Sequence, residues 1–375
     1  MHIGFIEDTH FHGGTQIWVV EAVQAFIQNN QEVSLLAPEG SWVVEQCRHT
    51  GAEITTYDWD EVVHEDSRNQ EIWTNALRDW DVAICTVHPP REGFHCSVFA
   101  ARCIKVGGLE THLIPKTGTI VPEYLREFYL PDESIHSSVI TITDFTRKYL
   151  IDKYHIPAEK VALIYQGTDT ERFQHSESAW VEAQHRYPLP RDASPILGSI
   201  GSFEHRKGHP VLFEALEELA NNSHPNVHLM MVGDGPDESI LKERVKILGL
   251  ERHVSFFPFT DEPNFVYERL DITVLPSLYK EGLPNVLLES MAMGVPVVSS
   301  NIGGVSEIVF EGETGYMVEP GDKSALADAI NKVWASQDNY QDMRRNAHKL
   351  IVNQFNKTTQ FDRFISHFHT INIAD

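Results

Sequence analysis

The segment SLYKEGLPNVLLESMAMGVPVVSSNIGGVSEIV, residues 277–309, decides the fold. Its two glutamates, Glu281 and Glu289, enclose seven residues that begin with Gly-Leu-Pro-Asn. The preceding DITVLPS has the pattern of a buried strand, and VLLESMAMG has that of a helix. We therefore expect Glu281 in the loop at the carboxyl end of the strand and Glu289 about one turn into the helix. Pro284 suits the first turn of that helix, where its missing N–H costs nothing.

The loop and the helix start together predict a site for a nucleotide sugar. Gly282 lets the backbone approach a ligand closely, and the N–H groups and dipole of the helix start attract anions. The two carboxylates would repel a phosphate, but a carboxylate accepts hydrogen bonds from vicinal hydroxyls, as an acid does from ribose in dinucleotide sites. The combination predicts a diphosphate at the helix, with a ribose at one carboxylate and a hexose at the other.

Strand and helix patterns alternate on both sides of a polar segment, residues 167–192. HIGFI, EVSLLAP and DVAICTVHP read as strands before it, and PILGSIGSF, VHLMMVGDG and VSFFPF read as strands after it. Alternation of this kind predicts doubly wound parallel sheets. We predict an α/β protein with two Rossmann-like domains, residues 1–168 and 169–355, facing a central cleft.

Two helices of the first domain can be placed in more detail. Thr143 or Asp144 is expected to cap a helix that follows the strand SSVITIT. A C-terminal helix of about residues 356–375, with an aromatic stripe, is expected to pack back on the first domain as part of its core.

Length and charge limit the class of protein. A chain of 375 residues fits two domains of ordinary size. Its formal charge is −24, with 54 acidic and 30 basic side chains, which argues against nucleic acid as a partner. The same balance argues weakly against coating of anionic membranes, although a local basic patch would still permit weak peripheral contact.

The remaining global features predict a cytoplasmic protein. The four cysteines form no C-x2-C pair and are expected to be buried, reduced thiols. The first residues, MHIGFIEDTHFHGG, do not have the pattern of a signal peptide. No apolar run approaches the ~18 residues of a spanning helix.

Residues 277–309 and several other segments of the chain resemble family 4 of the retaining glycosyltransferases. Members of that family have the two-domain GT-B architecture. The Glu281–Glu289 pair matches the E-x7-E motif of that family. The resemblance covers nearly the whole chain, through FHGG (residues 11–14), VALIYQGTDTERF (161–173), GSFEHRKG (201–208), MVGDGP (231–236), ERHVSFFPF (251–259) and GETGYMV (312–318).

The resemblance implies roles for individual residues. Glu281 would contact hydroxyls of the donor sugar, Glu289 would contact the ribose hydroxyls, and Lys207 would bind the diphosphate. Backbone groups would contribute to donor binding at Gly13, Gly14, Gly282, Leu283, Pro284 and Asn285, and the base would lie near Phe259. No metal site and no cofactor are implied, so protein cations must neutralise the leaving diphosphate.

Two positions depart from the family pattern. Ser202 stands where most members carry a second diphosphate-binding arginine, and Arg206 is the candidate to replace it. Many members also place a histidine or aspartate near the reacting carbon, and the matching segment here, HLIPKTGTIVPEY (112–124), offers Lys116, Thr117 and Gly118 instead. His88 and His112 lie near other strand ends.

The sequence thus predicts a retaining glycosyltransferase that moves a hexose, with glucose from UDP-glucose as the plainest choice, to a hydroxyl of a saccharide or lipid-linked acceptor. Polysaccharide biosynthesis is the expected setting. Two alternatives stay open: another GT-B-like enzyme, such as a sugar-nucleotide epimerase or an inverting transferase, and a catalytically weak homologue that binds sugar nucleotides. A dinucleotide dehydrogenase is disfavoured, because no G-x-G-x-x-G follows the first strand.

Overall fold

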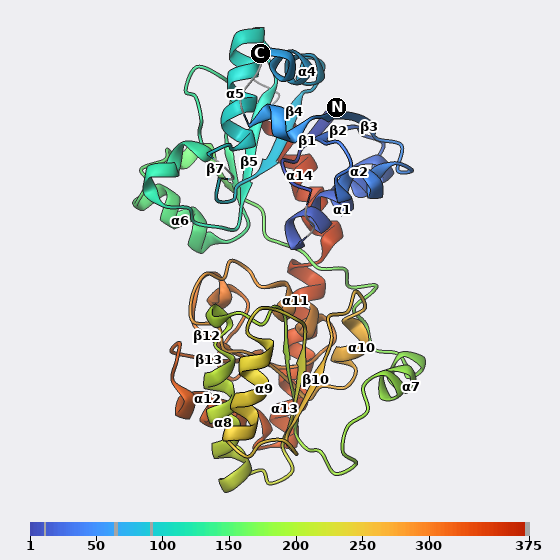
Figure 1. The fold of residues 1–375 in the computed structure, drawn as a ribbon, viewed down its shortest axis with the longest axis vertical. Coiled ribbons are helices and arrows are strands. Elements are labelled where there is room, and N and C mark those ends of the chain that lie inside the picture. The colour runs from blue at the N-terminus through green and yellow to red at the C-terminus, as the bar shows by residue number, and fades with distance from the viewer. Residues whose placement is uncertain (11–12, 64–66, 91–92, 372–375) are drawn as a thin grey trace. The chain divides into compact units, whose positions relative to one another are not determined.

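The computed structural model describes residues 1–10, 13–63, 67–90 and 93–371 (Figure 1). Its internal contacts divide the chain into two units, Met1–Tyr165 with Phe361–Asp375, and Gln166–Gln360. Residues 372–375 of the predicted C-terminal helix lie outside the described part. Both units are built from parallel strands with helices between them, which confirms the predicted fold class.

The described part of the first unit contains a seven-stranded parallel sheet in the order β3-β2-β1-β4-β5-β6-β7. The strands are β1 (His2–Ile6), β2 (Glu32–Pro38), β3 (Glu53–Tyr57), β4 (Val82–Thr86), β5 (His112–Thr117), β6 (Val139–Thr141) and β7 (Val161–Leu163). The chain runs outward from β1 to β3 and then crosses back to β4, so the strand order reverses between β1 and β4. In doubly wound sheets, ligands bind at the carboxyl ends of the strands at such a reversal.

The helices of the first unit are α1 (Gly14–Gln28), α2 (Trp42–Cys47), α3 (Trp59–Val62), α4 (Ser67–Leu77), α5 (Cys96–Gly107) and α6 (Asp144–Asp152). Thr143, one of the two predicted cap residues, caps α6 with its side chain. The C-terminal helix α14 (Lys357–Ile371) returns to this unit, and Figure 1 shows it, in red, beside α1. Phe364 of α14 packs against Trp18 and Phe26 of α1, which confirms that its aromatic stripe is core.

The second unit holds, within the described residues, a six-stranded parallel sheet in the order β10-β9-β8-β11-β12-β13. Its strands are β8 (Ile196–Ile200), β9 (His228–Val232), β10 (Val254–Phe257), β11 (Ile272–Leu275), β12 (Val297–Ser300) and β13 (Gly315–Val318). Its helices are α7 (Glu177–Arg186), α8 (His209–Asn222), α9 (Glu238–Ile247), α10 (Asn264–Tyr267), α11 (Asn285–Ala292), α12 (Lys323–Trp334) and α13 (Gln337–Gln354). Here the strand order reverses between β8 and β11.

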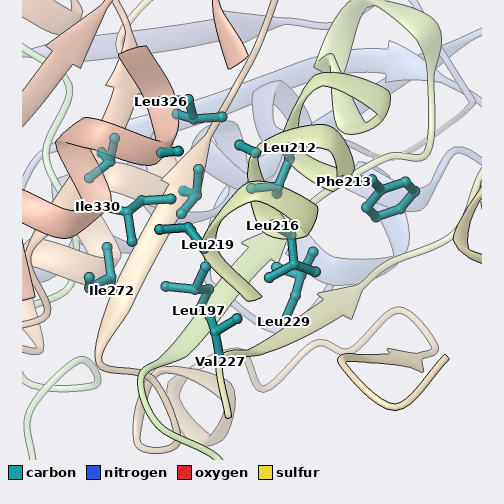
Figure 2. Close-up of a cluster of buried hydrophobic side chains, with 14 of the residues drawn as sticks. Leu197, Leu212, Phe213, Leu216, Leu219, Val227, Leu229, Ile272, Leu326 and Ile330 are labelled. Carbon is teal, nitrogen blue, oxygen red and sulfur yellow. The ribbon is translucent and has the colours of Figure 1, made fainter. Parts of the chain in front are cut away.

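Apolar side chains from α8, α12 and the central strands form the core of the second unit (Figure 2). Leu212 and Leu216 of α8 lie with Leu326 and Ile330 of α12 over the sheet, and all four are fully buried or nearly so. The loops after β8 and β11 leave this packed sheet at its carboxyl edge.

The structure differs from the sequence expectations at two places. The polar segment 167–192 contains a helix, α7, which Ser176 caps and which Arg186 anchors over the ring of Phe265 at 4.2 Å. The sequence of this helix has no apolar stripe that would predict it. A cap and ion pairs stabilise the helix instead. Pro284 is the cap residue of α11 and not part of its first turn. Among the described helices, none is both long and apolar enough to cross a membrane.

Candidate functional site

Two loops meet where the strand order of the second sheet reverses. Residues 201–208 follow β8, and residues 276–284 follow β11. The backbone N–H of Leu278 donates to the carbonyl of Arg206 at 2.7 Å, which joins the two loops directly. Two segments that lie far apart in the sequence thus form one surface at the carboxyl edge of the sheet.

Glu281 is the centre of a charged cluster on these loops. Its Oε1 accepts hydrogen bonds from Lys207 Nζ at 2.8 Å and from Ser277 Oγ at 2.7 Å, and Arg206 Nη1 lies 3.4 Å away. The side chains of Glu281 and Lys207 are only 8% and 14% exposed, so solvent screens their attraction little. The structure therefore brings together the three residues that the sequence singled out for catalysis.

Arg206 is shared between two acids. Its Nε donates to Glu204 Oε2 at 2.8 Å, on the side away from Glu281. Desolvation raises the pKa of Glu204, but the hydrogen bond and charge of Arg206 outweigh it, so that the pKa is lowered. Glu204 thus stays ionised and offsets the charge of Arg206, which leaves Lys207 as the better placed cation for an anionic ligand.

Two glycines with positive φ let the loops approach this closely. A Cβ atom on Gly208 (φ +68°) would lie 2.1 Å from the carbonyl oxygen of Pro276. A Cβ atom on Gly303 (φ +57°) would lie 1.9 Å from the carbonyl oxygen of Glu281, and the neighbouring Gly304 N–H donates to the carbonyl of Gly282 at 2.9 Å. The glycine pair after β12, Gly303 and Gly304, therefore packs against the backbone of the Glu281 loop and holds it in place.

Glu289 is the fifth residue of α11, as predicted, and is held by a buried tyrosine. The hydroxyl of Tyr267 donates to Glu289 Oε2 at 2.9 Å. Tyr267 is 1% exposed, and burial together with the charge of Glu289 raises its pKa well above the ordinary value. Sequence reasoning missed Tyr267, because an aromatic residue in an apolar run reads as plain core.

The start of α11 follows the Glu281 loop directly. Pro284, its cap residue, makes no side-chain hydrogen bond to the helix, and the first turn contains no acidic residue. Its first N–H groups and dipole therefore favour an anion. Leu283 and Pro284 are buried, and Asn285 is exposed. Phe259 lies past the end of β10 and is 56% exposed.

The predicted glycine loop belongs to the first unit. Gly13 precedes α1 with an extended backbone, and Gly14 is the first residue of the helix. Phe11 and His12 of the same motif lie outside the described residues. The contact of this loop with the donor stays a prediction.

Asp8 and His88 form a pair where the strand order of the first sheet reverses, after β1 and β4. His88 Nε2 lies 2.7 Å from Asp8 Oδ1, and His88 Nδ1 lies 2.7 Å from the carbonyl oxygen of Pro89. Because both ring nitrogens face acceptors, the ring carries two hydrogens and a positive charge. Burial lowers the pKa of His88, but the hydrogen bond and charge of Asp8 outweigh it and raise the pKa to about 11.

His88, His95 and Cys96 place potential metal-ligand atoms within 4.8 Å of one another. Hydrogen bonds already occupy the imidazoles: both nitrogens of His88 are engaged as described above, and His95 Nδ1 lies 2.8 Å from Ser97 Oγ. Burial and the charge of His88 lower the pKa of His95 to about 3, so His95 is neutral. The geometry of this cluster is that of a hydrogen-bonded network.

Of the polar residues that the sequence analysis named in the segment HLIPKTGTIVPEY, Lys116 and Thr117 are both buried. Lys116 is buried, with Nζ 3.8 Å from the centre of the Trp18 ring, and burial lowers its pKa to about 7. The hydroxyl of Thr117 donates to the carbonyl of Thr119. His112 begins β5 and so lies at the amino edge of the sheet, whereas His88 lies at the carboxyl edge.

The Asp8–His88 pair predicts a pH dependence of stability. In the unfolded chain a histidine loses its proton near pH 6.5, whereas folded His88 keeps it to about pH 11. Between these two pH values His88 is protonated in the folded state but not in the unfolded state. The contribution of His88 to the free energy of unfolding is therefore largest below pH 6.5. It declines as the pH rises, by at most about 1.4 kcal/mol per pH unit. Urea unfolding of the wild type and of His88→Gln between pH 6 and 9.5 should show a difference that shrinks with increasing pH. A difference that is constant or grows would contradict the charged pair.

Residues 181–350 match the family described as Glycosyl transferases group 1. The chain is 34% identical over 176 residues to the lipopolysaccharide core biosynthesis glycosyltransferase LpsE of Rhizobium meliloti (strain 1021), covering 47% of this chain and 50% of LpsE. It is 28% identical over 241 residues to the alpha-D-kanosaminyltransferase of Streptomyces kanamyceticus, covering 63% and 61% of the two chains. The chain thus spans about half to three fifths of the length of these curated relatives.

Solved structures match the fold over the full chain. A glycosyltransferase from Rickettsia africae ESF-5 has a TM-score of 0.85 at 19% identity, covering 100% of this chain and 99% of its own. Anabaena Alr3699/HepE, solved in complex with UDP-glucose, has a TM-score of 0.83 at 19% identity, covering 99% and 100%. The architecture of the two units is therefore the GT-B fold of glycosyltransferases.

Proposed function

We propose that this chain is a retaining glycosyltransferase that transfers a hexose, glucose from UDP-glucose in the plainest case, to a hydroxyl of a saccharide or glycolipid acceptor. The contact between Glu281 and Lys207 beside the start of α11 is the observation that carries the proposal. A hexosyl diphosphate presents its sugar hydroxyls directly next to its phosphates. An acid for the hydroxyls and a cation for the phosphates must then be neighbours, and here they are 2.8 Å apart.

Each residue of the site has a distinct role in this proposal. Lys207 and the first N–H groups of α11 bind the diphosphate and stabilise the negative charge that develops on it as it leaves. Glu281 accepts hydrogen bonds from the hexose, and Glu289, held by Tyr267, accepts them from the ribose. The backbone of residues 282–285 lies along the sugar and diphosphate, and Phe259 lies near the base.

In the proposed reaction the acceptor hydroxyl attacks from the face that the diphosphate leaves, and a departing phosphate oxygen takes its proton. The transition state resembles an oxocarbenium ion. Glu281 already accepts hydrogen bonds from Lys207 and Ser277. These bonds make its carboxylate a poor nucleophile for double displacement, and we assign it the role of hydrogen-bond acceptor for the sugar. This supports a front-face reaction.

One observation supports UDP as the nucleotide of the donor, and another supports glucose as its sugar. HepE, a protein of the same fold, has been solved with UDP and with UDP-glucose. No feature of the sequence calls for a pocket for an N-acetyl or carboxylate group. The relative LpsE acts in lipopolysaccharide core biosynthesis by its name, which supports polysaccharide or glycolipid assembly as the setting.

The anomeric configuration of the product tests the proposal. UDP-, GDP- and ADP-sugars are first screened for binding by calorimetry, and the binding donor is then used for transfer to candidate acceptors. NMR of the product should show the α configuration when the donor is an α-linked UDP-sugar. A β product would identify an inverting enzyme, and conversion of the sugar nucleotide without transfer would identify an epimerase.

A second candidate, a homologue that binds sugar nucleotides with little catalysis, is favoured by the state of Arg206. Ser202 replaces the usual arginine, and Glu204 neutralises the residue that could take its place. Slow hydrolysis of the bound donor in water separates the two: the transferase hydrolyses it measurably, whereas the binding homologue holds it intact.

Activity is expected to be independent of divalent metal ions, because Lys207 and α11 supply the positive charge at the diphosphate. Sugar transfer measured in excess EDTA should equal transfer in Mg²⁺ or Mn²⁺ within about twofold, far less than the several kcal/mol of transition-state stabilisation that a catalytic metal supplies. A loss of turnover in EDTA that Mn²⁺ restores would contradict this role of Lys207.

A further inference from the structure

A polar cavity lies in the second unit, at the amino-terminal edge of its sheet. It has a volume of about 320 Å³. Residues just before β11 and β12 and at the start of β8 line it, so it lies at the edge opposite the Glu281 loop. Its side-chain groups include Arg269, Asp271, Tyr340 and Arg344. This volume falls in the range of small-molecule sites.

Two arginines, Arg269 and Arg344, line this cavity. Arg344 Nε donates to the carbonyl of Gly294 at 2.9 Å, and Arg269 Nε donates to the carbonyl of Tyr187 at 3.3 Å. These bonds fix the direction of each guanidinium. Within the described part of the chain, no hydrogen bond or ion pair of their terminal nitrogens is found. A rigid guanidinium with unused terminal N–H groups suits a phosphate or carboxylate.

The acids that line the cavity already have partners. Both oxygens of Glu268 are engaged, by the ring of His175 at 2.6 Å and by the N–H of Ser176 at 3.0 Å. Asp271 Oδ2 accepts from the N–H of Ile196 at 2.7 Å. Asp271 remains a nearby negative charge that reduces the attraction for an anion, so the ligand must gain its affinity from direct bonds to the arginines.

Tyr267 connects this cavity with the proposed donor site. It lines the cavity, and its hydroxyl donates to Glu289 Oε2. It belongs to α10, whose chain continues through Glu268 and Arg269 into β11. A ligand bonded to Arg269 therefore contacts the short segment that also carries Tyr267, the residue whose hydroxyl holds Glu289.

We propose that this cavity binds a small phosphorylated ligand through Arg269 and Arg344, and that its occupancy strengthens nucleotide binding at Glu289 through Tyr267. The inference that the cavity binds a phosphorylated ligand depends only on the cavity. The inference that this ligand affects nucleotide binding depends on the proposed function. Equilibrium coupling between two sites typically changes an affinity by roughly 5- to 150-fold, and we expect the low end of that range.

Binding is tested by calorimetric titration of the full chain with inorganic phosphate and with glycerol phosphate, and glycerol is the uncharged control. Wild-type protein and Lys207→Ala should bind both phosphates, and Arg344→Gln and Arg269→Gln should each bind them roughly tenfold or more weakly. Arg345→Gln is the matched control, because Arg345 lies on α13 beside Arg344, is exposed and pairs with Asp342. Melting curves check that each variant is folded.

Loss of phosphate binding in Lys207→Ala, with retention in Arg344→Gln and Arg269→Gln, would place the anion at the loop after β8 and overturn the proposal. Absence of binding to the wild type would overturn it as well. Coupling is tested by titrating UDP with and without phosphate: wild-type affinity should rise about fivefold, and Tyr267→Phe should abolish that rise. If UDP does not bind at all, the proposed function fails, while the phosphate titrations still decide the cavity.

Discussion

Lys207→Ala is expected to lower the turnover of sugar transfer by on the order of 10²–10³-fold, which corresponds to about 3–4 kcal/mol. Lys207 pairs with one acid, Glu281, whereas the charge of Arg206 is shared between Glu204 and Glu281. Loss of Lys207 removes stabilisation of the charge that grows on the leaving group. Initial rates at saturating donor and acceptor measure the effect.

Two further variants serve as comparisons for Lys207→Ala. Lys246→Ala removes an exposed lysine of α9 in the same unit and should leave turnover unchanged. Arg206→Ala should lower turnover less than Lys207→Ala, because Glu204 already neutralises Arg206. Turnover near the wild-type value in a folded Lys207→Ala protein would refute the assignment of this lysine.

Glu281→Ala is expected to reduce turnover on the order of 10²-fold or more, through two effects. The variant loses a charged acceptor for the sugar hydroxyls, which is worth about 1.5–3 kcal/mol. It also leaves Lys207 without its partner in a largely buried position, which lowers the free energy of unfolding by up to about 3 kcal/mol and lets the lysine move. Turnover and urea unfolding measure the two effects separately.

Glu281→Gln separates charge from hydrogen bonding at the same position. The amide oxygen can still accept from Ser277 or from a sugar hydroxyl, but it no longer attracts Lys207, so turnover should fall between the wild type and Glu281→Ala. Glu313→Gln, an exposed acid before β13, is the control and should behave as the wild type. Wild-type turnover in Glu281→Ala would show that this acid does not contact the sugar.

The sequence predicted the parts of the fold that depend on apolar pattern and local signals. EVSLLAP became β2 with the same bounds, Thr143 caps its helix, and Glu281 and Glu289 lie in the loop and on the helix as their spacing indicated. Such features depend on neighbouring residues only. Helix α7 was missed because its apolar residues Trp180 and Val181 stay exposed and form no buried stripe. Its Arg186 is held by Glu262, which is 76 positions away and which no local pattern reveals.

The site residues that sequence reasoning missed share one property: their partners are distant in the chain. Tyr267 meets Glu289 across 22 positions, and Asp8 meets His88 across 80. His88 resembled one loop histidine among many until the sheet order placed it beside Asp8. The pairing of Arg206 with Glu204 was missed for a different reason, because it depends on how the loop after β8 turns.

A crystal structure of the full chain with UDP tests the central claim most directly. The account predicts that the ribose hydroxyls bind Glu289, and that the diphosphate lies against the first N–H groups of α11 within hydrogen-bond distance of Lys207 Nζ. UDP bound at any other place, or bound here with Glu289 and Lys207 turned away from it, would contradict the account.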